Sequence, residues 1–239
     1  HQMVLIDMDD EMPYFIGRYM DAFCGVVKTT WLDDAHVRAY SDDHVQSLVK
    51  HPMDYVASVV KELGLDKKTI AVEMDNYYFT ARAFERLVAG LPDAKFVDGD
   101  LLVNWVRIIK SPNEIALQRR AGKIAELAMQ AAIDNLHAGA RQCDVVAKIY
   151  EAQLRGTAEF GGDYASIVPL MPQGETAGAP HLTWTDKKYP DNTVVAVELA
   201  GCHMRYHSPM ARTVCIGKPS QKVIDTAEIA VEGLNAALE

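Results

Sequence analysis

The sequence has few cysteines and lacks both a long apolar run and a paired-cysteine motif. Its four cysteines, Cys24, Cys143, Cys202 and Cys215, include no C-x2-C pair. This spacing argues against a zinc site built from them and favours reduced, mostly buried thiols. No apolar run approaches the ~20 residues that a membrane-spanning helix needs. We therefore expect a cytoplasmic protein with no membrane partner and no metal bound by cysteine.

Runs of basic residues are also missing. The formal net charge is −9 over 239 residues, and the longest basic clusters, such as Lys187 and Lys188, are two residues long. An acidic surface repels phosphate backbones, so we expect no nucleic-acid partner. With 49% hydrophobic residues, the chain can bury a sizeable core in one or two domains.

The two ends carry neither the pattern of a signal peptide nor a helix-ending signal. The first residue is His1, and a strand-like pattern follows at once. The last residue, Glu239, falls inside an apolar helical repeat with no glycine cap. These features predict an internal segment of a longer chain.

Strand-like and helix-like patterns alternate over residues 1–110. Short β-branched or apolar runs predict strands over 3–8, 14–16, 69–73 and 94–97. Apolar residues at helical spacing predict helices over 52–63, with Pro52 in the first turn, and over 78–88. The first part is therefore predicted to be α/β.

A domain boundary is predicted near residue 110. Ser111 is a good N-cap, Pro112 suits the first helical position, and Glu114 lies where a capping box places its acid. A helix is expected from there to about residue 138, followed by a second over 143–154. Strands are expected over 165–170 and 193–199, the second almost wholly apolar apart from Glu198.

Residues 197–213 read V-E-L-A-G-C-H-M-R-Y-H-S-P-M-A-R-T. This outline resembles the signature of the pita-bread family, which includes prolidases, aminopeptidase P, methionine aminopeptidases and creatinase. Family metalloenzymes read roughly D-x-G-x5-Y-x2-D-x-T-R-T, and both Asp bind metal. Tyr206, Arg212 and Thr213 stand at the family's Tyr, Arg and Thr. Glu198 and Pro209 occupy the two ligand positions, and proline has no side-chain donor atom.

The order of elements extends this resemblance beyond the signature. The segment K-S-P-N-E-I at residues 110–115 is similar to the start of the family's catalytic domain. The resemblance implies that residues 1–110 are the later part of a creatinase-like N-terminal α/β domain. It also implies that residues 111–239 are the first half of an α+β pita-bread catalytic domain. Both domains are then expected to be truncated in this chain, and the whole protein is expected to be a homodimer.

Glu198 and His181 are the candidate catalytic residues. Glu198 stands in an apolar run, which favours a nucleophile or general base that lines a cavity. The alternative is a buried ion pair, for example with Arg212. His181 stands where the resemblance implies an active-site histidine that moves protons without a metal. The alternative for His181 is a histidine that is hydrogen-bonded at the start of a strand.

Five further residues are candidates for substrate binding. His203 and His207 are four apart, and on one extended strand they would face the same side. Such a pair forms a substrate wall or two metal ligands, although histidine pairs also occur as plain surface residues. Tyr164, Trp184 and Tyr206 offer aromatic faces on which an amidinium stacks, and ordinary core packing is the alternative. Arg212 and Thr213 are expected to support the sheet.

These residues predict an enzyme that works without a metal or other cofactor. Glu198 would bind a cationic amidine and attack it or deliver water, and His181 would protonate the departing ring nitrogen. The predicted reaction is hydrolysis of a C–N bond in a small zwitterionic cyclic amidine. Three alternatives stay open: a creatinase-like amidinohydrolase, a metal-dependent Xaa-Pro dipeptidase or aminopeptidase, and a catalytically inactive binding module.

Overall fold

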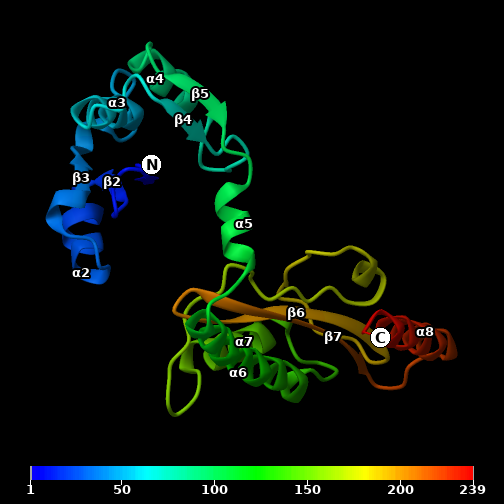
Figure 1. Ribbon diagram of the computed structural model, residues 1–239. Helices are drawn as coiled ribbons and strands as arrows, with labels where there is room; N and C mark the ends of the chain where they lie inside the picture. The colour runs from blue at the N-terminus through cyan, green and yellow to red at the C-terminus, as the bar shows by residue number, and fades with distance from the viewer. Residues whose placement is uncertain (1, 239) are drawn as a thin grey trace. The chain divides into compact units, whose positions relative to one another are not determined.

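The structure is a computed structural model that describes residues 2–238 (Figure 1). The chain divides into two compact units, His1–Ile109 and Lys110–Glu239. Within residues 2–238, no helix combines the length and the apolar character required to cross a bilayer.

The first unit holds two small sheets. Strand β1 (Met3–Leu5) pairs antiparallel with β2 (Tyr14–Arg18), and β2 pairs parallel with β3 (Val37–Tyr40). Strand β4 (Thr69–Val72) pairs parallel with β5 (Lys95–Asp98). The core of this unit is built mainly from helices α3 and α4. The helical segments are α1 (Tyr19–Asp21), η1 (Ala22–Val26), α2 (Val27–Thr29), η2 (Asp34–His36), η3 (Asp42–His44), α3 (Pro52–Glu62), α4 (Ala81–Gly90) and α5 (Leu102–Ile108).

Local signals explain where these elements differ from the predicted ranges. The helix expected over 52–63 is α3, within one residue at its end. The helix expected over 78–88 begins only at Ala81, because the Thr80 side chain caps it by accepting a hydrogen bond from the Ala83 N–H at 3.2 Å. The strand expected over 3–8 ends at Leu5, and a turn follows it.

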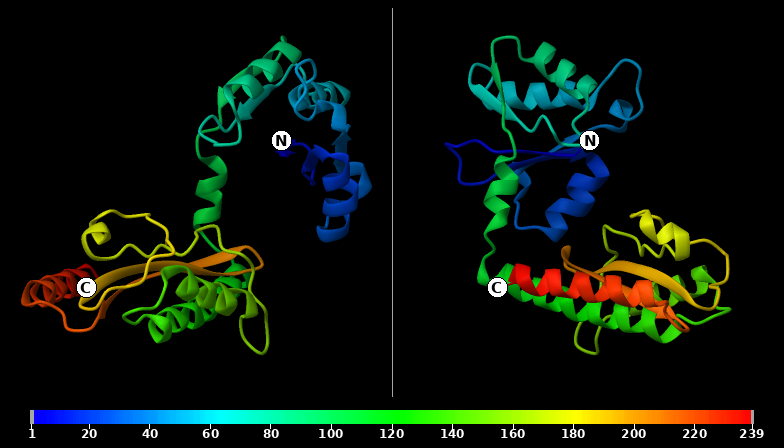
Figure 2. Two further views of the ribbon diagram at one scale, coloured as in Figure 1. Left: turned by 180° about the vertical axis from the view of Figure 1, so that it is seen from behind. Right: turned by 90° about the vertical axis from the view of Figure 1, so that its right-hand side faces the viewer.

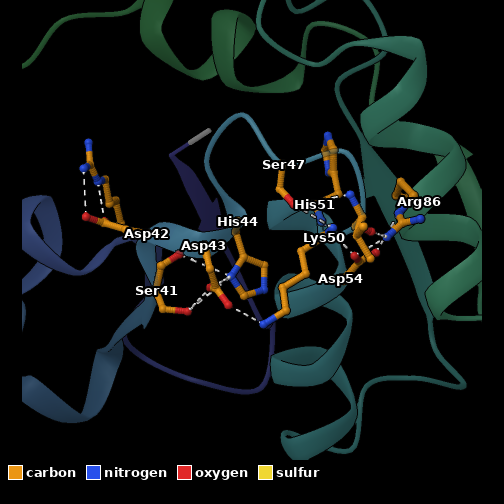
Figure 3. A network of polar contacts seen from close by, with 11 residues as sticks. Ser41, Asp42, Asp43, His44, Ser47, Lys50, His51, Asp54 and Arg86 are labelled. Atoms are coloured by element: carbon orange, nitrogen blue, oxygen red, sulfur yellow. Dashed lines mark hydrogen bonds and ion pairs between the residues drawn. The ribbon is translucent and has the colours of Figure 1, made fainter.

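Polar contacts fix the loop that leads into α3 (Figure 3). The Asp43 carboxylate accepts hydrogen bonds from the Ser41 hydroxyl and the Lys50 ammonium, and it contacts His44 Nδ1 at 3.0 Å. The Lys50 hydrogen bond is the largest of the effects that lower the pKa of Asp43 to about 2. An ion pair between two residues of the loop therefore holds it together.

His51 begins α3 as an N-cap. Its Nδ1 accepts a hydrogen bond from the Met53 N–H at 3.1 Å, and the Asp54 carboxylate accepts one from the His51 N–H at 2.8 Å. Arg86 of α4 pairs with the same Asp54 carboxylate, with Nε at 2.9 Å from Oδ1, and so ties the two helices together. Burial lowers the pKa of His51, which is consistent with a cap that accepts only while the ring is neutral.

The second unit packs two helices against a long hairpin. Helix α6 (Pro112–Asn135) starts with the expected capping box, in which Ser111 Oγ accepts from the Glu114 N–H and Glu114 Oε2 accepts from the Ser111 N–H. The other elements are α7 (Gln142–Arg155), η4 (Gly174–Gly178), β6 (Thr193–His203), β7 (Tyr206–Ile216) and α8 (Gln221–Leu238).

Helices α6 and α7 cover one side of the β6–β7 hairpin, and the segment that carries η4 passes on the other side (Figures 1 and 2). Val195, Val197 and Leu199 of β6 are buried in the core on the helix side. Gly201 allows a close approach of α6, because a Cβ there would lie 2.1 Å from the Ala121 carbonyl oxygen. The second unit therefore has one well-packed sheet face.

The strand predicted over 165–170 is wrong. Instead of a strand, two isolated bridges pair this region with β6, Leu170 with Glu198 and Gln173 with Val195. Two features prevent strand pairing in the residues before these bridges. Pro169 has no N–H, and the Ser166 N–H donates to the His207 ring. The strand expected over 193–199 is present and extends to His203.

Candidate active site

Burial alternates along β6 from Thr193 to Leu199, and residues 199–203 are all buried, so the two faces of the hairpin differ most in its first part. The helix face carries the odd-numbered residues of β6, which are buried against α6 and α7. The opposite face, here called the open face, carries Glu198. Antiparallel register places ten residues on the open face: Val194, Ala196, Glu198, Ala200 and Cys202 of β6, and His207, Pro209, Ala211, Thr213 and Cys215 of β7.

Glu198 is partly buried, and it pairs through its backbone with the segment beside β6. Its N–H donates to the Leu170 carbonyl at 3.0 Å, and its carbonyl accepts from the Leu170 N–H at 2.9 Å. Both backbone groups therefore point away from β7. The Glu198–Ala211 pair is then a non-hydrogen-bonded pair, the kind in which opposite side chains lie closest.

Small or apolar residues surround the Glu198 side chain. Ala196 and Ala200 flank it along β6, Ala211 lies opposite, and Leu170 borders it on the other side. Pro209 and Thr213 are its diagonal neighbours, and only the threonine offers a hydroxyl. Within residues 2–238, no Lys, Arg or His lies within ion-pair distance of its carboxylate. The structure therefore presents one carboxylate without a protein cation beside it.

The structure excludes the ion pair of Glu198 with Arg212. Arg212 pairs with Val197 across the hairpin, so its side chain starts on the helix face. Its Nη1 donates to the Ala211 carbonyl oxygen at 2.7 Å. Arg212 thus covers a backbone acceptor of β7 and leaves the carboxylate on the other face alone.

Pro209 fits its strand because of its register. It lies opposite Ala200, two residues along from the Glu198 pair, and is therefore also in a non-hydrogen-bonded pair. Its nitrogen points to the outer edge of β7, so no hydrogen bond to β6 is lost. The two positions that the resemblance assigns to metal ligands share the open face as diagonal neighbours.

The donors at these positions do not fit a two-metal centre. Glu198 supplies a carboxylate, whereas Pro209 supplies no donor atom at all. In the part of the chain that the structure describes, no group of three or more His, Cys, Asp or Glu side chains could hold a metal ion. Within residues 2–238, these two positions therefore supply one carboxylate and no second ligand.

His181 lies on an exposed loop after η4, with a left-handed φ of +67°. The neighbouring Leu182 carbonyl accepts from the Met171 N–H at 3.2 Å, and Leu170 pairs with Glu198. The His181 loop is thus joined to Glu198 through the backbone, first by the Leu182–Met171 hydrogen bond and then by the pairing of Leu170 with Glu198. Among residues 2–238, no hydrogen bond links the two side chains, and the catalytic role of His181 stays a prediction.

The expectation that His203 and His207 face one side is wrong. Met204 and Arg205 form the turn between the strands, with φ of +47° and +65°. His203 therefore pairs with Tyr206, and His207 pairs with Cys202, which places the two rings on opposite faces. A spacing of four predicts one face only when no turn intervenes.

Both histidines hold loop residues. His203 is 9% exposed, and its Nδ1 lies 2.9 Å from the Gly161 carbonyl oxygen while Nε2 lies 3.4 Å from Arg120 Nη1. His207 Nε2 accepts from the Ser166 N–H at 3.0 Å, and its Nδ1 lies 3.0 Å from the Arg205 carbonyl oxygen. Each ring thus ties the 160–170 loop to the hairpin.

The three aromatic candidates lie at three separate places. The Tyr206 hydroxyl donates to Glu114 Oε1 at 3.0 Å from the helix face. Trp184 packs edge-on against Tyr150 in the core, with ring centroids 6.1 Å apart. Tyr164 is 71% exposed, and the Arg205 guanidinium carbon lies 4.1 Å from its ring centroid. The structure brings none of them together with Glu198 on the open face.

Sequence reasoning missed Leu170 and Ala211, the neighbours of Glu198 on either side. Ala211 could have been found, because alternation through a hairpin with a two-residue turn places it opposite Glu198. Leu170 could not, because isolated bridges leave no periodic pattern.

Comparison with known proteins assigns both parts of the chain. Residues 3–109 match the Creatinase/Prolidase N-terminal domain, and residues 116–239 match Metallopeptidase family M24. An ectoine hydrolase of Halomonas elongata is 40% identical over all of this chain and 61% of its own length. An uncharacterized hydrolase/peptidase of Sinorhizobium fredii is 42% identical over all of this chain and 60% of its own length. The chain thus spans about three fifths of these relatives.

Solved structures show the same fold. An X-Pro aminopeptidase from Thermotoga maritima superposes with a TM-score of 0.78 at 22% identity, over 97% of this chain and 58% of its own. A prolidase from Pyrococcus furiosus superposes with a TM-score of 0.71 at 20% identity, over 97% of this chain and 60% of its own. The chain therefore belongs to the creatinase/prolidase family, with a creatinase-type N-terminal domain followed by the pita-bread domain of metallopeptidase family M24.

Proposed function

We propose that the whole protein is a metal-independent hydrolase that opens a ring C–N bond of ectoine, a cyclic amidine with a carboxylate, and yields an N-acetyl-diaminobutyrate. One observation carries the proposal: of the two positions that the family uses for metal ligands, one holds Glu198, which has no cationic partner within residues 2–238, and the other holds a proline. The 40% identity with an ectoine hydrolase supports the choice of substrate.

The chemistry follows from the charge of the substrate. Peptide hydrolysis in this frame relies on a Lewis acid, because an amide carbonyl is a poor electrophile. The carbon of an amidinium is already electron-poor at neutral pH. The Glu198 carboxylate attracts this cation, and the small residues around it leave the carbon accessible.

The reaction then takes two steps. A Glu198 oxygen attacks the amidinium carbon, the ring C–N bond breaks, and His181 gives a proton to the departing nitrogen. Water next adds to the acyl-type covalent intermediate, its proton returns to His181, and the bond to Glu198 breaks. The sum is addition of one water across the C–N bond. In a rival route Glu198 acts as a general base and activates water directly.

Intact-mass spectrometry distinguishes these routes. In His181→Ala protein soaked with ectoine, the covalent route predicts an adduct that accumulates, because solvent can protonate the departing nitrogen whereas the attack of water on the adduct has lost its proton carrier. The Glu198→Gln protein, treated in parallel, is expected to show no adduct. A His181→Ala protein that binds ectoine without a mass shift would exclude the covalent route and leave the general-base route.

Metal analysis tests independence from metal. We expect turnover of ectoine to survive dialysis against a chelator, with no stoichiometric Mn, Co or Zn in the active protein. Loss of activity on chelation and recovery with added metal would instead support a metal-dependent dipeptidase or aminopeptidase. Cleavage of Xaa-Pro dipeptides would point the same way.

A substrate panel separates ectoine hydrolysis from creatine hydrolysis and from a binding role. Preference for creatine over ectoine would indicate a creatinase-like amidinohydrolase, which needs the same unpaired carboxylate. No turnover of ectoine, creatine or dipeptides by correctly folded whole protein would favour a binding module. We also propose a homodimer, and light scattering that shows a monomer at micromolar concentration would contradict it.

A further inference from the structure

Glu198 and Ala211 face each other in a non-hydrogen-bonded pair of the hairpin. In such a pair the two Cβ atoms lie about 4.5–5.5 Å apart. A group bound to the Glu198 carboxylate on the open face must therefore pass over or beside residue 211. Ala211 is exposed, and it is the residue of β7 nearest to this carboxylate by register.

The other neighbours of Glu198 leave less space for a ligand. Ala200 is 2% exposed and Leu170 is 5% exposed, so the space on their sides is already filled by protein. On the side of β7, by contrast, Pro209, Ala211 and Thr213 are all exposed. Among the described residues around Glu198, the exposed neighbours are therefore those of β7, and Ala211 is the one directly opposite the carboxylate.

We propose that Ala211 is a specificity-determining residue, which sets the size of the cationic head group that Glu198 accepts. This rests on the proposed function, because it takes Glu198 to bind the cation of the substrate. The methyl group of alanine leaves room for a ring beside the carboxylate. A β-branched side chain at position 211 fills that room, whereas a small linear amidinium still reaches the carboxylate from above.

Two isosteric variants separate volume from hydrogen bonding. Ala211→Val adds volume alone, and Ala211→Thr adds nearly the same volume with a hydroxyl that can donate to Glu198. Both residues favour strands, so an exposed strand position tolerates them. Cys215→Val is the matched control, because it adds volume on the same face of β7, opposite Val194 and away from Glu198.

The probes are benzamidinium and acetamidinium chloride, titrated calorimetrically into the whole protein. Ala211→Val is expected to weaken benzamidinium binding at least about tenfold, or 1.4 kcal/mol, and acetamidinium binding less than about threefold. Ala211→Thr is expected to weaken benzamidinium similarly and acetamidinium more than the valine does, because its hydroxyl competes for the carboxylate. Cys215→Val is expected to change neither.

Equal weakening of both probes by Ala211→Val, no weakening of either, or no binding of either probe to the unmodified protein would overturn the inference. Ectoine turnover is measured on the same samples. If the probes show the expected pattern and ectoine is not hydrolysed, the proposed function fails while the role of Ala211 stands. If ectoine is hydrolysed and Ala211→Val leaves benzamidinium binding unchanged, only the role of Ala211 fails.

Discussion

The two faces of the β6–β7 hairpin differ in almost every physical respect, although alternate residues of the same strands build them. On the helix face, the odd-numbered residues of β6 are buried, and the His203 ring contacts the Gly161 carbonyl oxygen and Arg120. On the open face, Glu198 stands among alanines, and no cationic side chain of residues 2–238 forms an ion pair with it. The helix face thus packs against α6 and α7, whereas the opposite face carries the candidate catalytic carboxylate.

The comparison predicts its largest effect on stability at Gly201, on the helix face. A Cβ there would lie 2.1 Å from the Ala121 carbonyl oxygen and 2.4 Å from the Ala125 nitrogen, so Gly201→Ala must push α6 away from β6. We expect a loss of about 1–3 kcal/mol in the free energy of unfolding, the range for overpacked cores. Urea unfolding of the whole protein measures it.

The matched control for this substitution is Gly178→Ala. The added methyl group would meet nothing within 4 Å there. It is expected to change the free energy of unfolding by less than about 0.5 kcal/mol. Equal effects at both positions would show that the helix face is less tightly packed than the structure indicates.

A smaller effect is expected from Tyr206→Phe, which removes the hydrogen bond from the helix face to Glu114. The Ser111 backbone N–H is the largest of the effects that lower the pKa of Glu114, the Ser111 side chain is next, and the Tyr206 hydroxyl adds to them. The variant is therefore expected to raise the pKa of Glu114, and NMR titration of its carboxyl carbon measures this.

The pH dependence of that contact has a defined sign. A folded-state pKa below the unfolded value means that the contact stabilises the fold above the unfolded pKa and is lost as pH falls through the folded pKa. Tyr206→Phe should thus reduce the loss of stability on acidification in the range around pH 4. A pKa of Glu114 that is the same in both proteins would contradict the contact.

The smallest effect concerns two cysteines that share the open face. Cys202 is fully buried, and burial raises the pKa of its thiol. Cys215 is partly buried and lines a groove of about 750 Å³ between the hairpin and α8. Because the thiolate is the nucleophile, iodoacetamide at pH 8 is expected to modify Cys215 well before Cys202. Peptide mapping by mass spectrometry measures both rates. Faster labelling of Cys202 would show that its thiol is not buried.

The elements with strong local signals could be predicted from the sequence. Helix α3 and the start of α6 were found through Pro52 and the Ser111–Glu114 capping box, because caps act within one turn of the chain. The 165–170 segment was not, because its apolar residues resemble a strand while Pro169 and the Ser166–His207 contact prevent one. The conformation of such segments depends on contacts with residues that are distant in the sequence.

The Glu198 carboxylate could be singled out from the sequence as a candidate, whereas its surroundings could not be predicted. Glu198 stands out because a charge in an apolar strand needs a reason. The places of His203, Tyr206 and Trp184 depend on the turn at Met204 and Arg205 and on packing against α6 and α7. Spacing along the chain carries no such information, so it could not place these three side chains, and their assignment to the substrate stays a prediction.

The central claim is that Glu198 serves a ligand and not the fold, and Glu198→Gln tests it in one protein. Removing a carboxylate that pairs with no protein cation is expected to change the free energy of unfolding by less than about 0.5 kcal/mol. Turnover of ectoine is expected to fall at least about a thousandfold, the effect of losing a nucleophile or general base. A folded variant with undiminished turnover, or one that loses several kcal/mol of stability, would contradict the account.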